Sequence, residues 1–167
     1  QSLRGSGDLG GAMAAYAKRA EMGEGTNDEE VYISLLERAR LLAGPHGGGE
    51  YPAIEAAFLS AWMSRPTRSE ALGSLAVYCL NSSRPIQAAT FALIAAGIAK
   101  PQMDRLFIEE DWYDWKALEV FAEASYEAKN FQAAQETYID LLVSPGLPEN
   151  RRDSVRARPS RANTGRS

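Results

Sequence analysis

The chain has 167 residues, of which 45% are hydrophobic and 24% are charged, a composition typical of one globular domain and incompatible with wholesale disorder. The single cysteine, Cys79, excludes a disulfide framework and a cysteine-based zinc site. The single histidine, His46, leaves too few soft ligands for most zinc or iron centres. The net charge of −4 excludes a protein that binds nucleic acid through its overall charge.

Both ends of the sequence are expected to be disordered. We expect no secretory leader in residues 1–7. Residues 151–167 carry six arginines and one acid. Val155 is the only large apolar residue in 151–167, so this segment has too little apolar surface to offset the entropy lost on ordering. We therefore expect an Arg-rich disordered tail over 146–167, either a plain solvated terminus or an arm for an anionic partner.

No apolar segment is long enough to cross a membrane. The longest, residues 88–99, is interrupted by Thr90 and Gly97 and is shorter than the roughly 20 residues that a bilayer requires. We expect a cytoplasmic protein without a membrane span.

Apolar residues recur at helical spacing between glycine and proline stops. Asn27 is a suitable N-cap, and Pro52 and Pro85 suit the first turns of two further helices. The only extended-looking piece is residues 106–108, in the long connection 102–111. The predicted helices cover about residues 8–23, 28–42, 52–65, 70–80, 85–100, 113–129 and 130–143.

The helices form pairs with a recurring pattern. Pro66 and Pro101 are 35 residues apart, and each follows a helix with a bulky apolar residue eight positions earlier, Phe58 or Leu93. One helical hairpin cannot bury its apolar face alone, whereas stacked hairpins can. The sequence therefore predicts an all-α solenoid of stacked antiparallel helix pairs, about seven helices, over residues 8–145.

These features resemble tetratricopeptide repeats, which share the period near 34 residues and the proline after the second helix. Four strings resemble, more narrowly, a tetratricopeptide-type region that accompanies family 2 glycosyltransferases: YAKRAEMG (16–23), DEEVYISLLERA (28–39), SRPTRSEAL (64–72) and LFIEEDWYDWKALEVFAEASY (106–126). Such enzymes transfer a sugar from a nucleotide-sugar donor, with a metal held by an acidic motif in a separate α/β domain. The resemblance implies a sugar-transfer context, and it places no catalytic residue here because the sequence contains no Asp-x-Asp motif.

An acidic patch interleaved with aromatic residues follows the long connection. It consists of Glu109, Glu110, Asp111 and Asp114. Clustered carboxylates can bind Mg²⁺ or Ca²⁺, but this spacing fits no cation loop, and we favour acids at the positive end of a helix dipole. Trp112 and Trp115 are predicted either to stack on a glycan or to fill the core.

Two arginines, Arg65 and Arg68, flank Pro66 and Thr67. Paired guanidinium groups can clamp a phosphate or carboxylate, and the favoured alternative is local pairing, for example with Glu70.

Two further residues have reactive side chains. Cys79 is expected to be a small buried hydrophobe because no base accompanies it. His46 is expected to be exposed in the glycine-rich loop 44–50, which lacks the lysine of a phosphate-binding loop.

In a solenoid of this kind the first helix of each pair lines the concave face. The acidic and aromatic set predicted there would suit a basic or apolar peptide, and it comprises Lys116, Glu119, Glu123, Tyr126 and Glu127. We expect a non-catalytic interaction module that accompanies a glycosyltransferase, without cofactor or metal of its own. A free-standing peptide adaptor is the alternative, and an enzyme ranks last because few acid–base residues are available.

Overall fold

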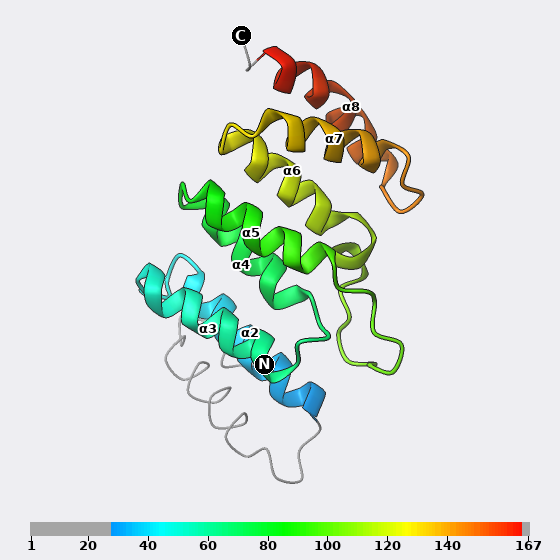
Figure 1. The fold of residues 1–167 in the computed structure, drawn as a ribbon. Coiled ribbons are helices and arrows are strands. Elements are labelled where there is room, and N and C mark those ends of the chain that lie inside the picture. Colours follow the sequence, from blue (N-terminus) through cyan, green and yellow to red (C-terminus); the bar gives the residue numbers. More distant parts are fainter. Residues whose placement is uncertain (1–27, 165–167) are drawn as a thin grey trace. The chain divides into compact units, whose positions relative to one another are not determined.

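The computed structural model describes the backbone of residues 28–164 and the side chains of residues 28–156. Within that part the fold is all-helical, as predicted, and consists of seven α-helices and one π-helical turn without a strand (Figure 1). The predicted helix over 8–23 lies outside the described residues. The elements are α2 (Asp28–Ala43), α3 (Tyr51–Ser64), α4 (Glu70–Asn81), α5 (Pro85–Ala96), the π-helical turn η2 (Trp112–Lys116), α6 (Ala117–Glu127), α7 (Phe131–Leu142) and α8 (Glu149–Thr164).

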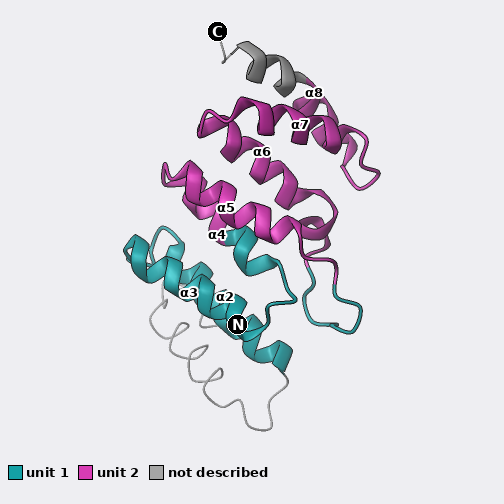
Figure 2. Ribbon diagram, viewed as in Figure 1, with its two compact units in different colours: residues 1–74, 101–108 teal, residues 75–100, 109–167 magenta. Residues whose placement is uncertain are grey.

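The chain divides into two compact units that alternate along the sequence (Figure 2). Among the described residues, unit 1 comprises 28–74 and 101–108, and within it α2 packs on α3. Unit 2 comprises the described residues 75–100 and 109–164, and within it α5 packs on α6, α6 on α7 and α7 on α8. The segment 101–108, called the 101–108 loop below, therefore belongs to unit 1 although residues of unit 2 precede and follow it.

The helices begin where the sequence places their start signals. Three acids, residues 28–30, occupy the first turn of α2, where the helix dipole favours negative charge. Pro52 and Pro85 lie in the first turns of α3 and α5. Asn130 caps α7, because its side chain accepts a hydrogen bond from the Ala133 backbone N–H at 3.4 Å.

The helices α3, α5 and α7 bury the same pattern of positions, i, i+4 and i+7. The three sets are Ile54, Phe58 and Ala61; Ala88, Ala92 and Ala95; and Ala134, Tyr138 and Leu141. The first two sets are 34 residues apart, so the predicted equivalence of Phe58 with Leu93 is wrong by one residue, and Leu93 is 56% exposed. The cause is that α5 also exposes large apolar side chains, Ile86, Leu93 and Ile94, so hydrophobicity did not identify its inner face, which the small alanines occupy.

One type of turn ends both α4 and α6. Ser83 and Lys129 adopt φ values of 61° and 67°, in the left-handed region that terminates helices. In each turn the N–H of the next residue donates to the carbonyl oxygen five residues earlier at 2.8 Å. The two hairpins thus share turn geometry as well as buried positions.

The C-terminal segment differs from the prediction of disorder over 146–167. Residues 149–164 form α8, and Val155 is fully buried in the core of unit 2. Arg152 donates to the carbonyl oxygens of Leu142 at 2.7 Å and Ser144 at 3.0 Å, at the C-terminal end of α7. Disorder is therefore wrong for 149–156, because one apolar anchor and a capping arginine attach this helix; residues 165–167 lie outside the described part.

Candidate functional site

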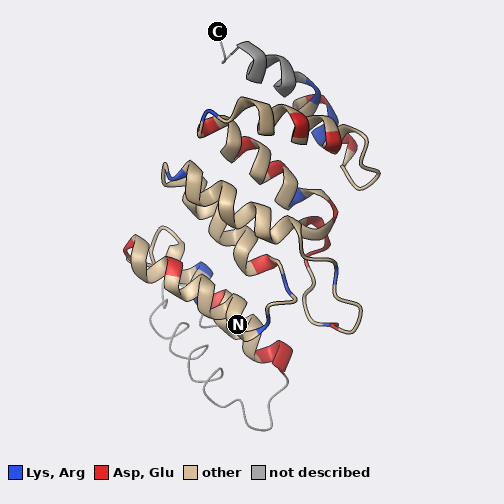
Figure 3. Cartoon of the chain, viewed as in Figure 1, with Lys and Arg blue, Asp and Glu red and all other residues tan. Residues whose placement is uncertain are grey.

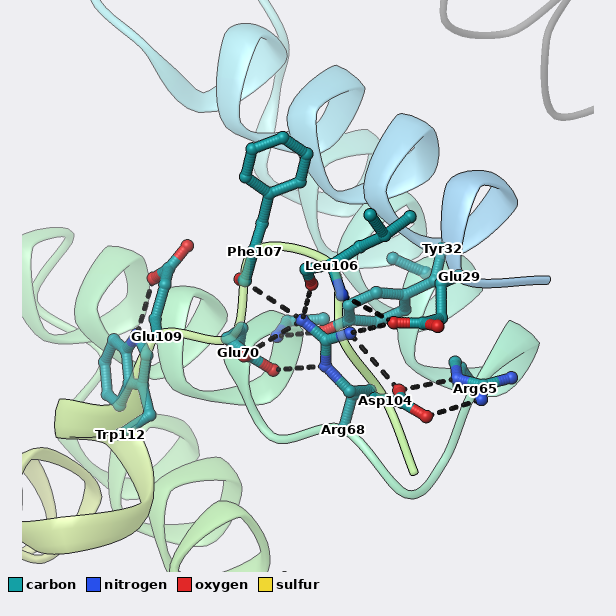
Figure 4. Close-up of polar contacts among 12 residues, drawn as sticks. Glu29, Tyr32, Arg65, Arg68, Glu70, Asp104, Leu106, Phe107, Glu109 and Trp112 are labelled. Atoms are coloured by element: carbon teal, nitrogen blue, oxygen red, sulfur yellow. Dashed lines mark hydrogen bonds and ion pairs between the residues drawn. The ribbon is translucent and has the colours of Figure 1, made fainter. Parts of the chain in front are cut away.

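Arg68 lies between α3 and α4 and is fully buried in unit 1 (Figure 4). Its Nε and Nη2 donate to the two carboxylate oxygens of Glu70, each at 3.1 Å, and its Nη1 donates to Asp104 Oδ2 at 3.2 Å. The guanidinium carbon is 4.9 Å from the centre of the Tyr32 ring, which adds a cation–π contact. A buried guanidinium is tolerated only when its donors are satisfied, as they are here.

The same arginine fixes the backbone of the 101–108 loop. Its Nη2 donates to the carbonyl oxygens of Leu106 at 3.1 Å and Phe107 at 3.3 Å. From the first turn of α2, Glu29 Oε1 accepts hydrogen bonds from the Arg105 and Leu106 N–H groups, each at 2.7 Å. Backbone N–H groups of the loop therefore bind the Glu29 carboxylate, and backbone carbonyl groups of the loop bind the Arg68 guanidinium. These charged side chains hold the loop in one conformation.

A second arginine completes this group of charges. Arg65 binds Asp104 through two hydrogen bonds of 2.8 and 2.6 Å. These bonds from Arg65 are the main reason that the pKa of Asp104 lies below its usual value, with a further contribution from Arg68 and opposition from burial. The Arg68 cluster, as named here, consists of Glu29, Tyr32, Arg65, Arg68, Glu70 and Asp104.

Local pairing of Arg68 with Glu70 was predicted and is confirmed. The role of Asp104 was not predicted, because it lies 36 residues beyond Arg68 in a loop without periodicity. The two arginines do clamp a carboxylate, but this carboxylate belongs to the chain itself. The cluster is therefore a structural centre that positions the loop rather than an open anion site.

The outer side of the loop carries large exposed side chains. Met103 is 82% exposed and Phe107 is 72% exposed, and Arg105 between them is also exposed. Phe107 has a φ of 50°, which is unfavourable for a residue with a side chain and persists only where the surroundings enforce it. Methionine, arginine and aromatic residues are the types enriched in protein interfaces.

Trp112, predicted as a glycan-stacking residue, is only 4% exposed. Its indole N–H donates to Glu109 Oε1 at 3.2 Å, and the ammonium of Lys116 is 4.7 Å from the ring centre. Burial contradicts a stacking role for this ring, because a sugar needs an open face. Trp115 is half-buried against the core of unit 2, and a glycan contact there stays a prediction.

The predicted acidic patch lies at the start of a helix, because helical structure begins at Glu110. Glu110 accepts a hydrogen bond from Lys100 at 2.6 Å, which lowers the pKa of Glu110 and raises that of Lys100. Asp111 makes no side-chain capping bond. Among the described residues, no group of three or more His, Cys, Asp or Glu side chains is arranged to hold a metal ion.

The predicted peptide-binding set on η2 and α6 is only partly available. Glu119 is 8% exposed and accepts hydrogen bonds from Arg151 Nε at 2.9 Å and Nη2 at 2.5 Å. The Tyr126 ring packs edge-on against Phe131 with centroids 5.3 Å apart. Glu127 is exposed, whereas Lys116 and Glu123 are half-buried. Peptide binding by this set stays a prediction, with Glu119 already engaged by the chain.

Two residues with reactive side chains remain. Cys79 is fully buried and His46 is exposed, both as predicted. The glycines beside it serve a tight turn: a Cβ on Gly47 would lie 2.2 Å from the Leu42 carbonyl oxygen, and Gly48 has a φ of +68°.

Comparisons of the chain with protein-family models, with curated proteins and with solved structures find no match. Among the described residues, no helix is both long enough and apolar enough to cross a lipid bilayer.

Proposed function

We propose that this chain is a non-catalytic helical module that binds a protein partner through the 101–108 loop. The observation that carries the proposal is the exposure of Met103 and Phe107 on a backbone fixed by the Arg68 cluster. Burying a phenylalanine in a partner is worth about 1.5–3 kcal/mol, and a loop that is already ordered loses little entropy on binding.

The class of partner is inferred from the segments that resemble a glycosyltransferase-associated region. Three of them, residues 28–39, 64–72 and 106–126, supply residues that meet at the Arg68 cluster and the loop. We therefore propose the catalytic domain of a family 2 glycosyltransferase, which this module would position relative to its acceptor. Arg105, the exposed charge of the loop, would face carboxylates on that domain.

The second candidate is a free-standing adaptor that binds a basic peptide, unrelated to sugars. It is favoured by the exposed carboxylate of Glu127 and the half-buried Tyr126 ring on α6. This function would use unit 2 and not the 101–108 loop, so substitutions in the loop separate the two candidates.

The test is titration calorimetry of the purified chain against the catalytic domain of a family 2 glycosyltransferase encoded in the same or a neighbouring reading frame. We expect Phe107→Ala to weaken binding at least tenfold, as expected for an aromatic anchor. Met63→Ala is the matched control, because Met63 is also exposed in unit 1 but lies on α3. Both variants should melt at the wild-type temperature.

Absence of binding, or equal affinity of Phe107→Ala and wild type, would contradict the proposal. Hydrolysis of a nucleotide sugar by the isolated chain would contradict its non-catalytic part. Binding of a basic peptide that Glu127→Lys abolishes and Phe107→Ala leaves unchanged would favour the adaptor instead.

A further inference from the structure

The first carboxylate of α6 holds an arginine of the same chain. Glu119 Oε2 accepts hydrogen bonds from Arg151 Nε at 2.9 Å and Nη2 at 2.5 Å, and Glu119 is only 8% exposed. The guanidinium carbon of Arg151 is 6.0 Å from the centre of the Trp115 ring. A carboxylate beside an aromatic ring recognises a guanidinium, since it supplies both an ion pair and a cation–π contact. Trp115 and Glu119, called the arginine site below, therefore form a built site that contains the group it recognises.

Three residues attach α8 to the rest of unit 2, and they lie on one helical face. Arg151 enters the arginine site, Arg152 caps the C-terminal end of α7, and Val155 is buried in the core. At about 100° per residue, the two arginines lie within roughly 60° of Val155 around the helix axis. The order Arg-Arg-x-x-Val is therefore a sequence pattern that this surface of α6 and α7 accepts.

The remainder of α8 contributes little to its attachment. Among residues 149–156, whose side chains the structure describes, Val155 is the only one that is buried. Pro159 lies inside the helix, where a proline has no N–H to donate to the preceding turn. Leu147 precedes α8 and is buried in the same core, so the core keeps this cover when α8 moves away. The helix α8 therefore belongs to the elements that open locally at low cost.

We propose that the arginine site binds a basic helix of a partner protein, and that α8 blocks the site until this partner displaces it. The partner helix carries the same pattern, an arginine that enters the site and an apolar residue four positions later. Charge favours a basic helix, because α6 presents Glu119, Glu123 and Glu127 at four-residue intervals, coloured red in Figure 3. A tethered helix competes at a high effective concentration, so the partner binds tightly only when α8 is released. This inference concerns unit 2 and does not depend on the function proposed for the 101–108 loop.

The test measures, by fluorescence anisotropy, how tightly the full chain binds a labelled peptide of residues 149–164. The release variant, Arg151→Ala with Val155→Ala, removes two of the three attachments of α8. We expect it to bind the peptide at least tenfold more tightly than the wild type, because the competing helix no longer fills the site. Adding Glu119→Gln to the release variant should abolish this gain, since the amide keeps the shape of the side chain and loses its charge.

Three controls use the same assay. Arg156→Ala should leave the affinity at the wild-type value, because Arg156 is exposed and pairs with Asp153 of its own helix. A peptide that carries Arg151→Ala should bind the release variant at least tenfold more weakly than the unchanged peptide. Phe107→Ala should leave peptide binding unchanged, which separates the outcome of this test from that of the loop.

Hydrogen exchange of the wild-type chain gives an independent readout that requires no variant to fold. The amides of α8 should exchange at least tenfold faster than those of α7, and an excess of the peptide should accelerate the exchange of α8 further. Uniform ¹⁵N labelling of the chain separates its masses from those of the peptide. Exchange of α8 as slow as that of α7, a release variant that binds no tighter than the wild type, or full affinity after Glu119→Gln would each overturn the proposal.

Discussion

Replacement of Arg68 by methionine is the most direct test of the buried cluster. The substitution removes a fully buried cation and keeps a side chain of similar length. It leaves the buried Glu70 carboxylate without its two guanidinium hydrogen bonds, and it removes the donor from the Leu106 and Phe107 carbonyl groups. Arg65 still binds Asp104, so the loop keeps one of its two attachments to a guanidinium.

The expected loss of folding stability follows from the buried ion pair between Arg68 and Glu70. Breaking a buried ion pair by removing one partner costs about 3–5 kcal/mol, a large part of the roughly 5–15 kcal/mol by which a domain is stable. The same cost raises the opening equilibrium of the loop by about two to four orders of magnitude. The Arg105 and Leu106 amides report this opening directly, because both donate to Glu29 in the closed loop.

Hydrogen exchange of the 101–108 segment, measured by mass spectrometry, and urea unfolding followed by circular dichroism provide the assay. Arg38→Met is the control, because Arg38 is exposed on α2 and surface substitutions usually change stability by less than about 0.5 kcal/mol. The double variant Arg68→Met with Glu70→Leu should recover at least about 1 kcal/mol, since it removes the unpaired carboxylate as well. The reasoning is refuted if Arg68→Met exchanges and unfolds like Arg38→Met, or if the double variant recovers nothing.

Three further predictions concern turns and pH. Gly47→Ala should cost about 1–3 kcal/mol, because its Cβ would lie 2.2 Å from the Leu42 carbonyl oxygen, whereas Gly44→Ala should be nearly neutral; thermal melts compare the two. Lys129→Gly should raise stability by about 0.5 kcal/mol and the melting temperature by about 1–2 °C, because relief of the left-handed strain outweighs the added chain entropy; a lower melting temperature would contradict this. The pKa of Asp104 is depressed in the folded state, so its contribution is present above its ordinary pKa of about 3.9 and is lost as pH falls through the folded value. The stability gap between wild type and Asp104→Asn should therefore be constant between about pH 5 and 7 and narrow below about pH 4; a gap that widens there would refute the assignment.

The sequence was sufficient for the helices α2 to α7, because their signals are local. Proline in the first turns of α3 and α5, the acids at the start of α2 and the Asn130 cap all lie where the elements begin. Burial of Cys79 and pairing of Arg68 with Glu70 were likewise predictable from neighbouring residues.

Features that depend on distant residues were not predictable. Asp104 binds arginines 36 and 39 residues away, and no periodicity distinguishes it from its neighbours in the loop. The inner face of α5 was assigned one residue off, because large apolar side chains also lie on its exposed side and the spacing of apolar residues does not separate the two faces. The sequence analysis treated Val155 as too little apolar surface to order residues 151–167. Val155 is nevertheless buried, in the same core as Leu147, and Arg152 bonds the end of α7, so these contacts together attach the segment.

The alternation of the two units along the sequence limits where the chain can be truncated without removing part of unit 1. Unit 1 takes the 101–108 loop from beyond residue 100, so a fragment that stops at residue 74 or 100 lacks Asp104 and both carbonyl acceptors of Arg68. In such a fragment the guanidinium groups of Arg65 and Arg68 would lack much of their hydrogen bonding. A nascent chain is in the same state until residue 108 has left the ribosome. Expression boundaries and domain deletions should therefore keep residues 28–108 together, and the first unit becomes complete only after part of the second has been synthesised.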